Sequence, residues 1–235
     1  MILALDTATR LLGLALLDGP SVLAELHLPT GGPGSSAPPV TQRLTPSVHG
    51  LLADLDLTPT AITALAVATG PGTFNGLRAG LAWAKGFALA HGAALVGIPT
   101  LHILAHSQPP TAADLVCVLQ AGRGRIAAQP FLWADDHWSA QPPYGITTWA
   151  DLLANLTQPT TIAGEIDPAG YAALMPIADR GIVAAPPHRN LRRPSALAQL
   201  AALRLALTPP DDPATLAPDY WHQPTVTPPG QPTPP

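Results

Sequence analysis

The chain has 235 residues, of which 47% are hydrophobic and 11% charged, and its formal net charge is −4. This length is enough for one large domain or for two lobes with separate cores. A dedicated nucleic-acid-binding protein usually has a basic excess, so we expect no strong direct binding to RNA or DNA. No uncharged apolar run reaches the roughly 20 residues that cross a bilayer. Asp6 and Asp18 bracket the apolar run 11–17, which argues against a secretory leader. We therefore expect a cytoplasmic protein without a membrane segment.

Two local features have plain structural explanations. Cys117 is the single cysteine, so no internal disulfide forms, and it lies in the apolar run 115–119, which predicts a buried strand. Four basic residues cluster late in the chain, namely His188, Arg189, Arg192 and Arg193. A run of charge of this kind is typical of a solvated loop.

The first half of the chain predicts alternating strands and helices. Strands are expected at 2–5, 12–17, 22–28, 64–68 and 95–98. The apolar spacing over 40–55 predicts an amphipathic helix, with Pro46 in its true first turn and Thr45 as N-cap. A long helix is expected over 76–91, ended by Gly92. Thr100 is expected to cap a short helix.

The second half has weaker patterns. Strands are expected at 115–119, 125–133 and 160–163, and helices at 148–155, 168–174 and 194–207. The stretch 223–235 holds six prolines in thirteen residues and is expected to be disordered. The alternation of strands and helices indicates an α/β protein.

The turn after the first strand is the first candidate site. Asp6 ends an apolar strand, and Thr7 and Thr9 follow in a tight turn. Backbone N–H groups and hydroxyls in such a turn can hold a phosphate or its metal. Asp and Thr also end strands for purely structural reasons, and the residues alone leave both readings open.

A glycine loop between a strand and the long helix is the second candidate site. Its key residues are Gly70, Gly72, Thr73 and Gly76. Glycines allow the backbone to turn sharply and to approach a ligand or another chain closely. The following helix offers free N–H groups at its N-terminus. No Gly-Lys-Ser/Thr follows, so the loop is not a P-loop.

The two segments together resemble one family. The resemblance rests on residues 2–9, on the run Gly70-Pro71-Gly72-Thr73-Phe74-Asn75-Gly76-Leu77-Arg78 with its continuation to Ala82, and on 84–86 through 95–98. On these the chain is similar to the bacterial tRNA threonylcarbamoyladenosine (t6A) dimerisation subunit family, TsaB or YeaZ. The resemblance implies an actin/Hsp70/sugar-kinase-like fold of two ribonuclease-H-like lobes. Residues 1–107 with 194–222 would form the first lobe and 108–193 the second.

The resemblance also implies a role within a complex. Family members pair with a homologous catalytic subunit (TsaD-like) that transfers threonylcarbamoyl to adenosine 37 of tRNA, and an ATPase subunit (TsaE-like) completes the complex. The chain would then be a non-catalytic copy of its partner and would meet tRNA only through the complex. The residues leave open whether it forms a homodimer when alone. It would need no cofactor of its own. The residues leave open whether a nucleotide binds, and the partner interface is the place where one would bind.

One departure from the family bears on activity. Where the family usually has Asp-Ala-Arg-x-x-Glu, this chain has Gln120-Ala121-Gly122-Arg123-Gly124-Arg125. A second hypothesis, a small-molecule kinase or ATPase of the same fold, needs a catalytic acid at the mouth of the cleft. Its expected position, Gln120, is not an acid. Glu165 and Asp167 are close in sequence, and we expect them to cap a helix, because Pro168 follows.

The histidines bear on a third hypothesis, a metallopeptidase. His102 and His106 are four residues apart on an expected helix, a spacing that can hold a metal. Relative to the catalytic relatives the pair is displaced by two residues, which turns a helix by roughly 200°. We therefore expect no metal site and two surface histidines.

The long helix 76–91 is the candidate partner interface. It is apolar nearly all round and so must be covered on more than one side. Small residues recur along one side at Gly76, Gly80, Ala84 and Ala88, with Leu77, Trp83 and Phe87 beside them. Small residues permit close helix approach, and buried aromatics anchor interfaces. The alternative is that the chain's own first helix covers this side.

Overall fold

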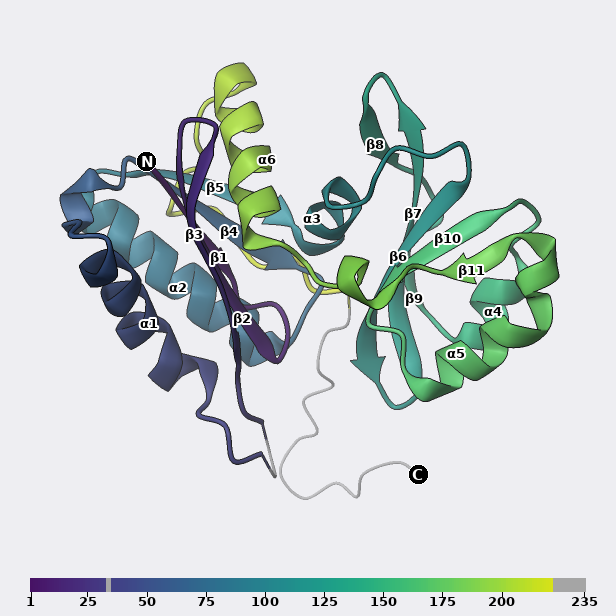
Figure 1. The fold of residues 1–235 in the computed structure, drawn as a ribbon. Coiled ribbons are helices and arrows are strands. Elements are labelled where there is room, and N and C mark those ends of the chain that lie inside the picture. The colour runs from purple at the N-terminus through teal and green to yellow at the C-terminus, as the bar shows by residue number, and fades with distance from the viewer. Residues whose placement is uncertain (33–34, 222–235) are drawn as a thin grey trace.

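The computed structural model describes residues 1–32 and 35–221, so the proline-rich stretch 223–235 lies outside the described residues. Two lobes stand side by side, each built around its own sheet (Figure 1). Within the described residues, no helix is both long enough and apolar enough to cross a membrane.

The first sheet has five strands in the order β3-β2-β1-β4-β5. They are β1 (Ile2–Asp6), β2 (Leu11–Asp18), β3 (Ser21–Pro29), β4 (Ala64–Gly70) and β5 (Ala94–Pro99). The first three strands form an antiparallel meander, and β4 and β5 run parallel to β1. As a result β1 and β4 are central neighbours, and the loops that follow them leave the sheet at the same edge.

The second sheet has six strands in the described residues. The path β11-β10-β6-β7-β8 comprises β11 (Ile182–Ala184), β10 (Thr160–Gly164), β6 (Asp114–Gly122), β7 (Arg125–Ala134) and β8 (His137–Ala140), and β9 (Gly145–Thr147) pairs with β7 off this path. Strands β10 and β11 are parallel to β6, whereas β7 is antiparallel to it. Both sheets therefore combine a parallel part with an antiparallel hairpin.

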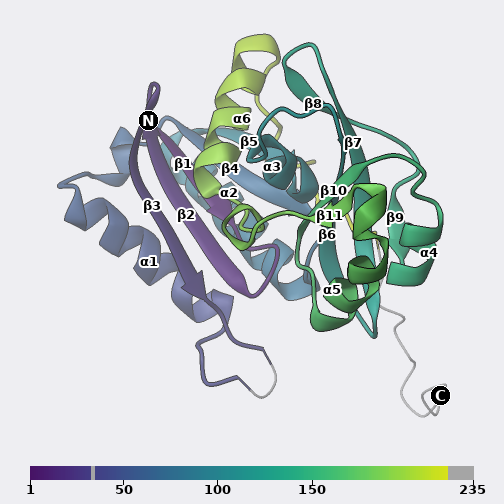
Figure 2. The same ribbon diagram turned by 45° about the vertical axis from the view of Figure 1, so that its right-hand side comes forward.

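Helices cover both faces of both sheets. They are α1 (Val40–Asp54), α2 (Phe74–His91), α3 (Thr100–His106), α4 (Trp149–Ala154), α5 (Pro168–Leu174) and α6 (Pro194–Leu207), with short 3-10 turns η1 (Pro59–Ala61), η2 (Met175–Arg180) and η3 (Pro187–Arg189). In Figure 1, α1 and α2 lie on the outer side of the first sheet, and α6 lies on the side that faces the second lobe. Figure 2 shows α3 between α6 and the second sheet.

Alternation along β1 explains this layering. Leu3 and Leu5 point to the core beneath α1 and α2, whereas Ala4 points to the opposite core, beneath α6. On that side α6 contributes Leu197 and three alanines, and small residues on both surfaces let the helix approach the sheet closely. The helix that returns from the second lobe thus completes the core of the first.

The structure corrects the start of two helices. α1 begins at Val40, with Pro39 as N-cap and Pro46 inside the helix, so the prediction that Pro46 lies in the first turn is wrong. Thr45 is not a cap; its hydroxyl accepts a hydrogen bond from Trp83 Nε1 at 3.0 Å. The hydroxyl of Thr100 likewise bonds Gly70 N at 3.1 Å instead of capping α3.

Candidate functional site

The two predicted motifs meet where β1 and β4 end. Residues 6–9 follow β1, and the glycine loop follows β4 and leads into α2. The backbone N–H of Thr73 donates to the carbonyl oxygen of Ala8 at 2.6 Å. A Cβ on Gly72 would overlap Ala8, and a Cβ on Gly76 would overlap the carbonyl oxygen of Thr7. These glycines therefore allow a close approach to the chain's own backbone.

Asp6 is buried and paired with an arginine from far along the chain. Arg192 Nε donates to Asp6 Oδ2 at 2.8 Å, and Arg192 Nη2 donates to Thr9 Oγ1 at 2.6 Å. The side chains of Arg192 and Asp6 are 5% and 3% exposed. Burial alone lowers the pKa of Arg192, but the charges of Asp6 and Glu165 outweigh burial and raise it above its ordinary value. The guanidinium is therefore charged at any ordinary pH.

The other polar atoms of the turn are also bonded within the chain. Asp6 Oδ1 accepts from the N–H of Ala8 at 2.9 Å, and Thr7 Oγ1 donates to the carbonyl oxygen of Gly76 at 2.8 Å. Within residues 1–32 and 35–221, every buried side-chain nitrogen and oxygen has a hydrogen-bond partner. For Asp6, Thr7 and Thr9 this favours the structural reading of the turn over the phosphate reading.

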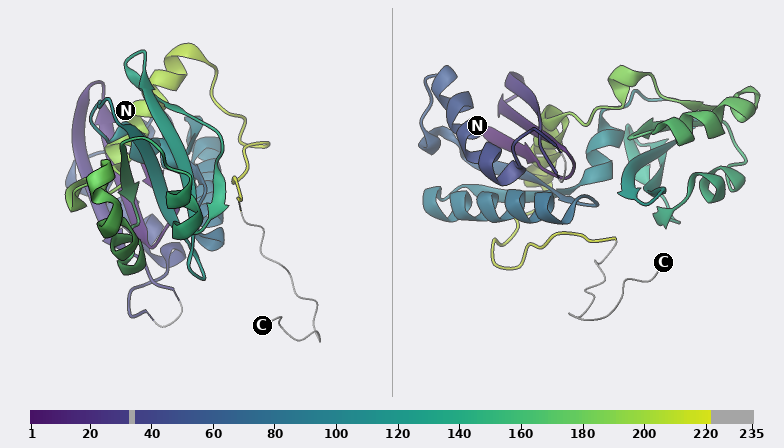
Figure 3. Two further views of the ribbon diagram at one scale, coloured as in Figure 1. Left: turned by 90° about the vertical axis from the view of Figure 1, so that its right-hand side faces the viewer. Right: turned by 90° about the horizontal axis from the view of Figure 1, so that it is seen from below.

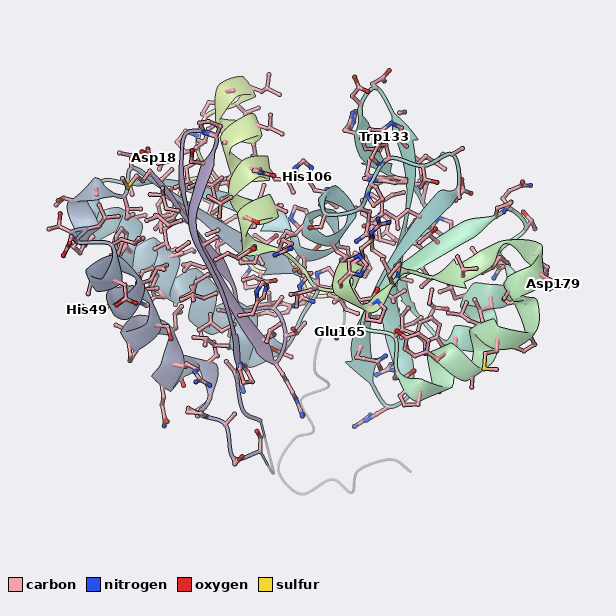
Figure 4. All side chains as sticks on the ribbon, in the orientation of Figure 1. Asp18, His49, His106, Trp133, Glu165 and Asp179 are labelled. Atoms are coloured by element: carbon pink, nitrogen blue, oxygen red, sulfur yellow. The ribbon has the colours of Figure 1, made fainter. Side chains whose placement is uncertain are left out.

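The second lobe faces this turn with Glu165, which lies at the junction of the lobes (Figure 4). Glu165 Oε1 lies 3.6 Å from Arg192 Nη1, and Glu165 Oε2 accepts from the N–H of Gln120 at 3.0 Å. The prediction that Glu165 caps a helix is thus wrong. Asp167 does cap α5, since its Oδ1 accepts from the N–H of Gly170 at 2.8 Å.

The basic cluster is a solvated loop except at Arg192, where that prediction is wrong; Arg193 is exposed, as predicted, although it forms an ion pair. Arg192 is buried in the ion pair with Asp6. Arg193 Nη1 donates to Glu25 Oε2 on β3 at 2.8 Å. His188 and Arg189 are exposed, as predicted.

A cleft of about 590 Å³ lies between the lobes beside the glycine loop. Two aromatic residues near the end of the described chain line it, Tyr220 and Trp221. The ring of Tyr220 lies 5.1 Å from that of Phe74 in the first lobe, and the ring of Trp221 lies 5.2 Å from that of Tyr144 in the second. Figure 3 shows residues 208–221, in yellow, running beneath the first lobe toward this junction. No sequence pattern indicated this aromatic contribution.

The side of α2 that was predicted to contact a partner is buried inside the chain. A Cβ on Gly80 would overlap the hydroxyl of Thr7, so this side faces the chain's own turn. Five of the seven predicted interface residues are buried inside the chain: Gly76, Leu77, Gly80, Ala84 and Ala88. The prediction that they form an outward ridge is wrong, because the ridge is what lets α2 lie close to the sheet and the turn.

Trp83 and Phe87 lie half-buried between α2 and α1. Their rings stack with centroids 5.1 Å apart, and Trp83 Nε1 donates to Thr45 Oγ1 on α1. The alternative, in which the chain's own first helix covers this side, therefore holds here. A role of Trp83 and Phe87 at a partner interface stays a prediction.

The side of α2 that faces away from the protein carries different residues. Four exposed residues follow one another along this side at spacings of four, four and three positions: Arg78, Ala82, Gly86 and Leu89. Leu89 is 75% exposed. We call these four residues the outer stripe of α2. Apart from Arg78 they are apolar, and two of them, Ala82 and Gly86, are also small.

His102 and His106 are half-buried on α3, so the expectation of two surface histidines is wrong. The His102 ring packs edge-on against Phe131 with centroids 5.3 Å apart. Burial lowers the pKa of both histidines, and for His106 a hydrogen bond with Gln199 offsets part of the effect. In the part of the chain that the structure describes, no group of three or more His, Cys, Asp or Glu side chains is placed to hold a metal.

Known proteins are similar to this chain in sequence and in fold. The model of the family TsaD, tRNA N6-adenosine threonylcarbamoyltransferase, matches residues 21–153. The chain is 27% identical over 224 residues to the Bacillus subtilis tRNA threonylcarbamoyladenosine biosynthesis protein TsaB, which covers 93% of both chains. It is 36% identical over 104 residues to the Escherichia coli protein of the same name, covering 44% of this chain and 42% of that one.

A solved structure matches the whole architecture. YeaZ from Pseudomonas aeruginosa superposes with a TM-score of 0.70 at 21% identity, covering 93% of this chain and 99% of that one. The expected fold, actin/Hsp70/sugar-kinase-like with two ribonuclease-H-like lobes, is confirmed. Because the family model covers more than half of the sequence and TsaB and YeaZ proteins match nearly its full length, the chain belongs to the TsaD family and is a TsaB/YeaZ-type member of it.

Proposed function

We propose that this chain is a non-catalytic partner subunit in the formation of threonylcarbamoyladenosine at position 37 of tRNA, docking to and supporting a catalytic TsaD-like paralogue. An ATPase subunit of the TsaE type completes the complex, and tRNA is met only through it. The relatives from B. subtilis and E. coli carry this pathway in their names. The observation that carries the docking role is the outer stripe of α2, an exposed and mostly apolar side of an 18-residue helix.

Physical chemistry favours this stripe as the contact surface. Ala82 and Gly86 have little or no side chain, so a second helix can approach the α2 backbone closely there. Leu89 offers an apolar side chain that is 75% exposed, whereas Arg78 is held by Tyr220 at one end of the stripe. The same stripe pairs two copies of this chain when the catalytic paralogue is absent.

The test introduces a charge on the outer stripe. In Ala82→Glu, a carboxylate at a close helix crossing is left without a partner, which costs about 3–5 kcal/mol and weakens association by at least about a hundredfold. The thermal midpoint should stay near that of the parent, because Ala82 is exposed in the free chain. Association is measured by sizing and calorimetry with the paralogue from the same organism.

A matched control places the same charge on another exposed apolar site. Leu207→Glu lies at the end of α6, where Leu207 is 85% exposed, and should bind the paralogue as the parent does. If Ala82→Glu and Leu89→Glu both associate normally, the outer stripe is not the docking surface.

The chain by itself should neither hydrolyse ATP nor modify tRNA above background. Gln120 stands where the catalytic hypothesis needs an acid, and it bonds Glu165 with both its backbone and its side chain. The chain itself requires no cofactor, and a nucleotide in the complex would be held at the partner interface. ATP hydrolysis that depends on Asp6, measured with Asp6→Asn, would show that this is an enzyme instead.

A further inference from the structure

One arginine links the two lobes at the base of their junction. Arg192 lies in the segment that leaves the second lobe and enters α6. Its guanidinium contacts Asp6 and Thr9 of the first lobe at 2.8 and 2.6 Å, and Glu165 of the second lobe at 3.6 Å. We call this set the Arg192 clasp.

The clasp occupies the place for which the turn is chemically suited as an anion or metal site. The carboxylate of Asp6 and the hydroxyl of Thr9 both point at the guanidinium, and Asp6 keeps its other oxygen on the N–H of Ala8. The cationic charge that a bound metal would supply at such a carboxylate is thus supplied by the chain itself.

The segments that cross between the lobes are fastened around the clasp. The backbone carbonyl of Arg192 lies 3.0 Å from His27 Nε2 on β3, and Ser195 donates to Glu25 through both its N–H and its hydroxyl. The side chain of Gln108, on the other crossing segment, donates to the carbonyl oxygen of Arg189 at 2.8 Å. The two segments that connect the lobes therefore lie side by side. A change in the angle between the lobes requires the backbone of both segments to move.

We propose that Arg192 is a built-in cation that fixes the angle between the two lobes without any bound ligand. Opening the junction would draw Arg192 away from Asp6 or from Glu165. The contact of Arg192 with Asp6 is the stronger of the two, because both side chains are buried and the contact is short. Separating these two side chains would leave a buried charge unpaired. Glu165 is 32% exposed and its contact is longer, so the link to the second lobe is the weaker one.

The test measures the distance between the lobes in solution. His49 on α1 and Asp179 in the second lobe are exposed and lie at opposite ends of the molecule (Figure 4). Spin labels attached at His49→Cys and Asp179→Cys report the distribution of the distance between these two positions by pulsed electron paramagnetic resonance. The native Cys117 is fully buried, so the labels attach to the introduced cysteines.

We expect one narrow distribution in the full chain that Mg²⁺–ATP does not shift. Arg192→Gln should add a second population at a different distance. The matched control Arg193→Gln removes the same charge one residue away. Arg193 is the N-cap of α6 and pairs with Glu25 on β3, and neither element belongs to the second sheet or its helices, so this variant should keep the narrow distribution. If Arg192→Gln does not fold, Glu165→Gln decides, because Glu165 is partly exposed and the substitution removes only charge.

The contrary results are equally definite. An unchanged distribution in Arg192→Gln, or in Glu165→Gln where the arginine variant does not fold, would overturn the proposal. So would a shift of the distribution of the parent on adding Mg²⁺–ATP, because the angle would then depend on a ligand. A second population in Arg193→Gln as large as in Arg192→Gln would also overturn it, since any lost charge in the segment would then suffice.

Discussion

Close backbone approach decides several residue identities around the Asp6 turn. Gly80 lies against Thr7, whose hydroxyl donates to Gly76 one helical turn earlier. A side chain at position 80 would therefore disturb the contact that holds the turn on α2. The glycines of this helix look alike in the sequence, yet Gly86 has open space around it. Their roles differ only because the fold places one inside and one outside.

This difference gives a matched pair of substitutions. Gly80→Ala should destabilise the protein by about 1–3 kcal/mol, because the new methyl group overlaps Thr7. Gly86→Ala should stabilise it by roughly 0.5–1 kcal/mol, since alanine costs less conformational entropy in a helix. Urea unfolding of both variants measures the difference. Equal effects at the two positions would mean that α2 does not lie on the turn as described.

The half-buried histidines predict a pH dependence. The pKa values of His102 and His106 in the folded chain lie below the ordinary 6.5, mainly because of burial. Below about pH 6.5 the unfolded chain therefore binds more protons, and stability falls as the pH falls. In the double variant His102→Gln/His106→Gln this part of the pH dependence should disappear. Urea midpoints above and below this pH measure it, and an equal loss in parent and variant would contradict the assignment.

At the scale of elements, the longer segments could be predicted from the sequence, even in the half of the chain with weaker patterns, and the shortest strands could not. Helices α5 and α6 and the central strands lie where the sequence predicts them, and Cys117 is buried in β6 as expected. The short strands β8, β9 and β11 were missed, since three or four residues carry no readable alternation. The pairing of Arg192 with Asp6 joins residues 186 apart, and no local pattern signals it.

Proline 46 shows how packing overrides local preference. Proline inside a helix removes a backbone hydrogen bond and costs about 3 kcal/mol, yet α1 runs through it because Leu44, Val48 and Leu51 are buried on the sheet. Exposed Pro46→Ala should stabilise the protein by about 2 kcal/mol once the greater freedom of the unfolded chain is subtracted. Pro39→Ala should have the opposite sign, since Pro39 has φ −63° at the N-cap, which suits proline. Denaturant unfolding of both variants checks the two signs, and a destabilised Pro46→Ala would contradict the account.

At the scale of the whole molecule, α3 belongs to both lobes. Ile103 packs in the core between the first sheet and α6, whereas Leu101 and Leu104 pack in the core of the second sheet. The domain boundary expected at residue 107 therefore falls directly after α3, a helix that packs in the cores of both lobes. Together with the Arg192 clasp and the aromatic contact of Trp221 with Tyr144, α3 makes the junction part of the folded core.

Because α3 packs in both cores, a substitution in α3 should reduce the stability of both lobes. Leu104→Ala should cost about 2–5 kcal/mol and should lower hydrogen-exchange protection in both β4 and β6, because loosening α3 loosens both cores. Leu51→Ala is the matched control: Leu51 packs only in the core between the first sheet, α1 and α2. It should lower protection in β4 and leave β6 protected, as expected where parts of a protein open separately. Protection lost from only one lobe in Leu104→Ala would mean that the lobes are independent units and that α3 merely passes between them.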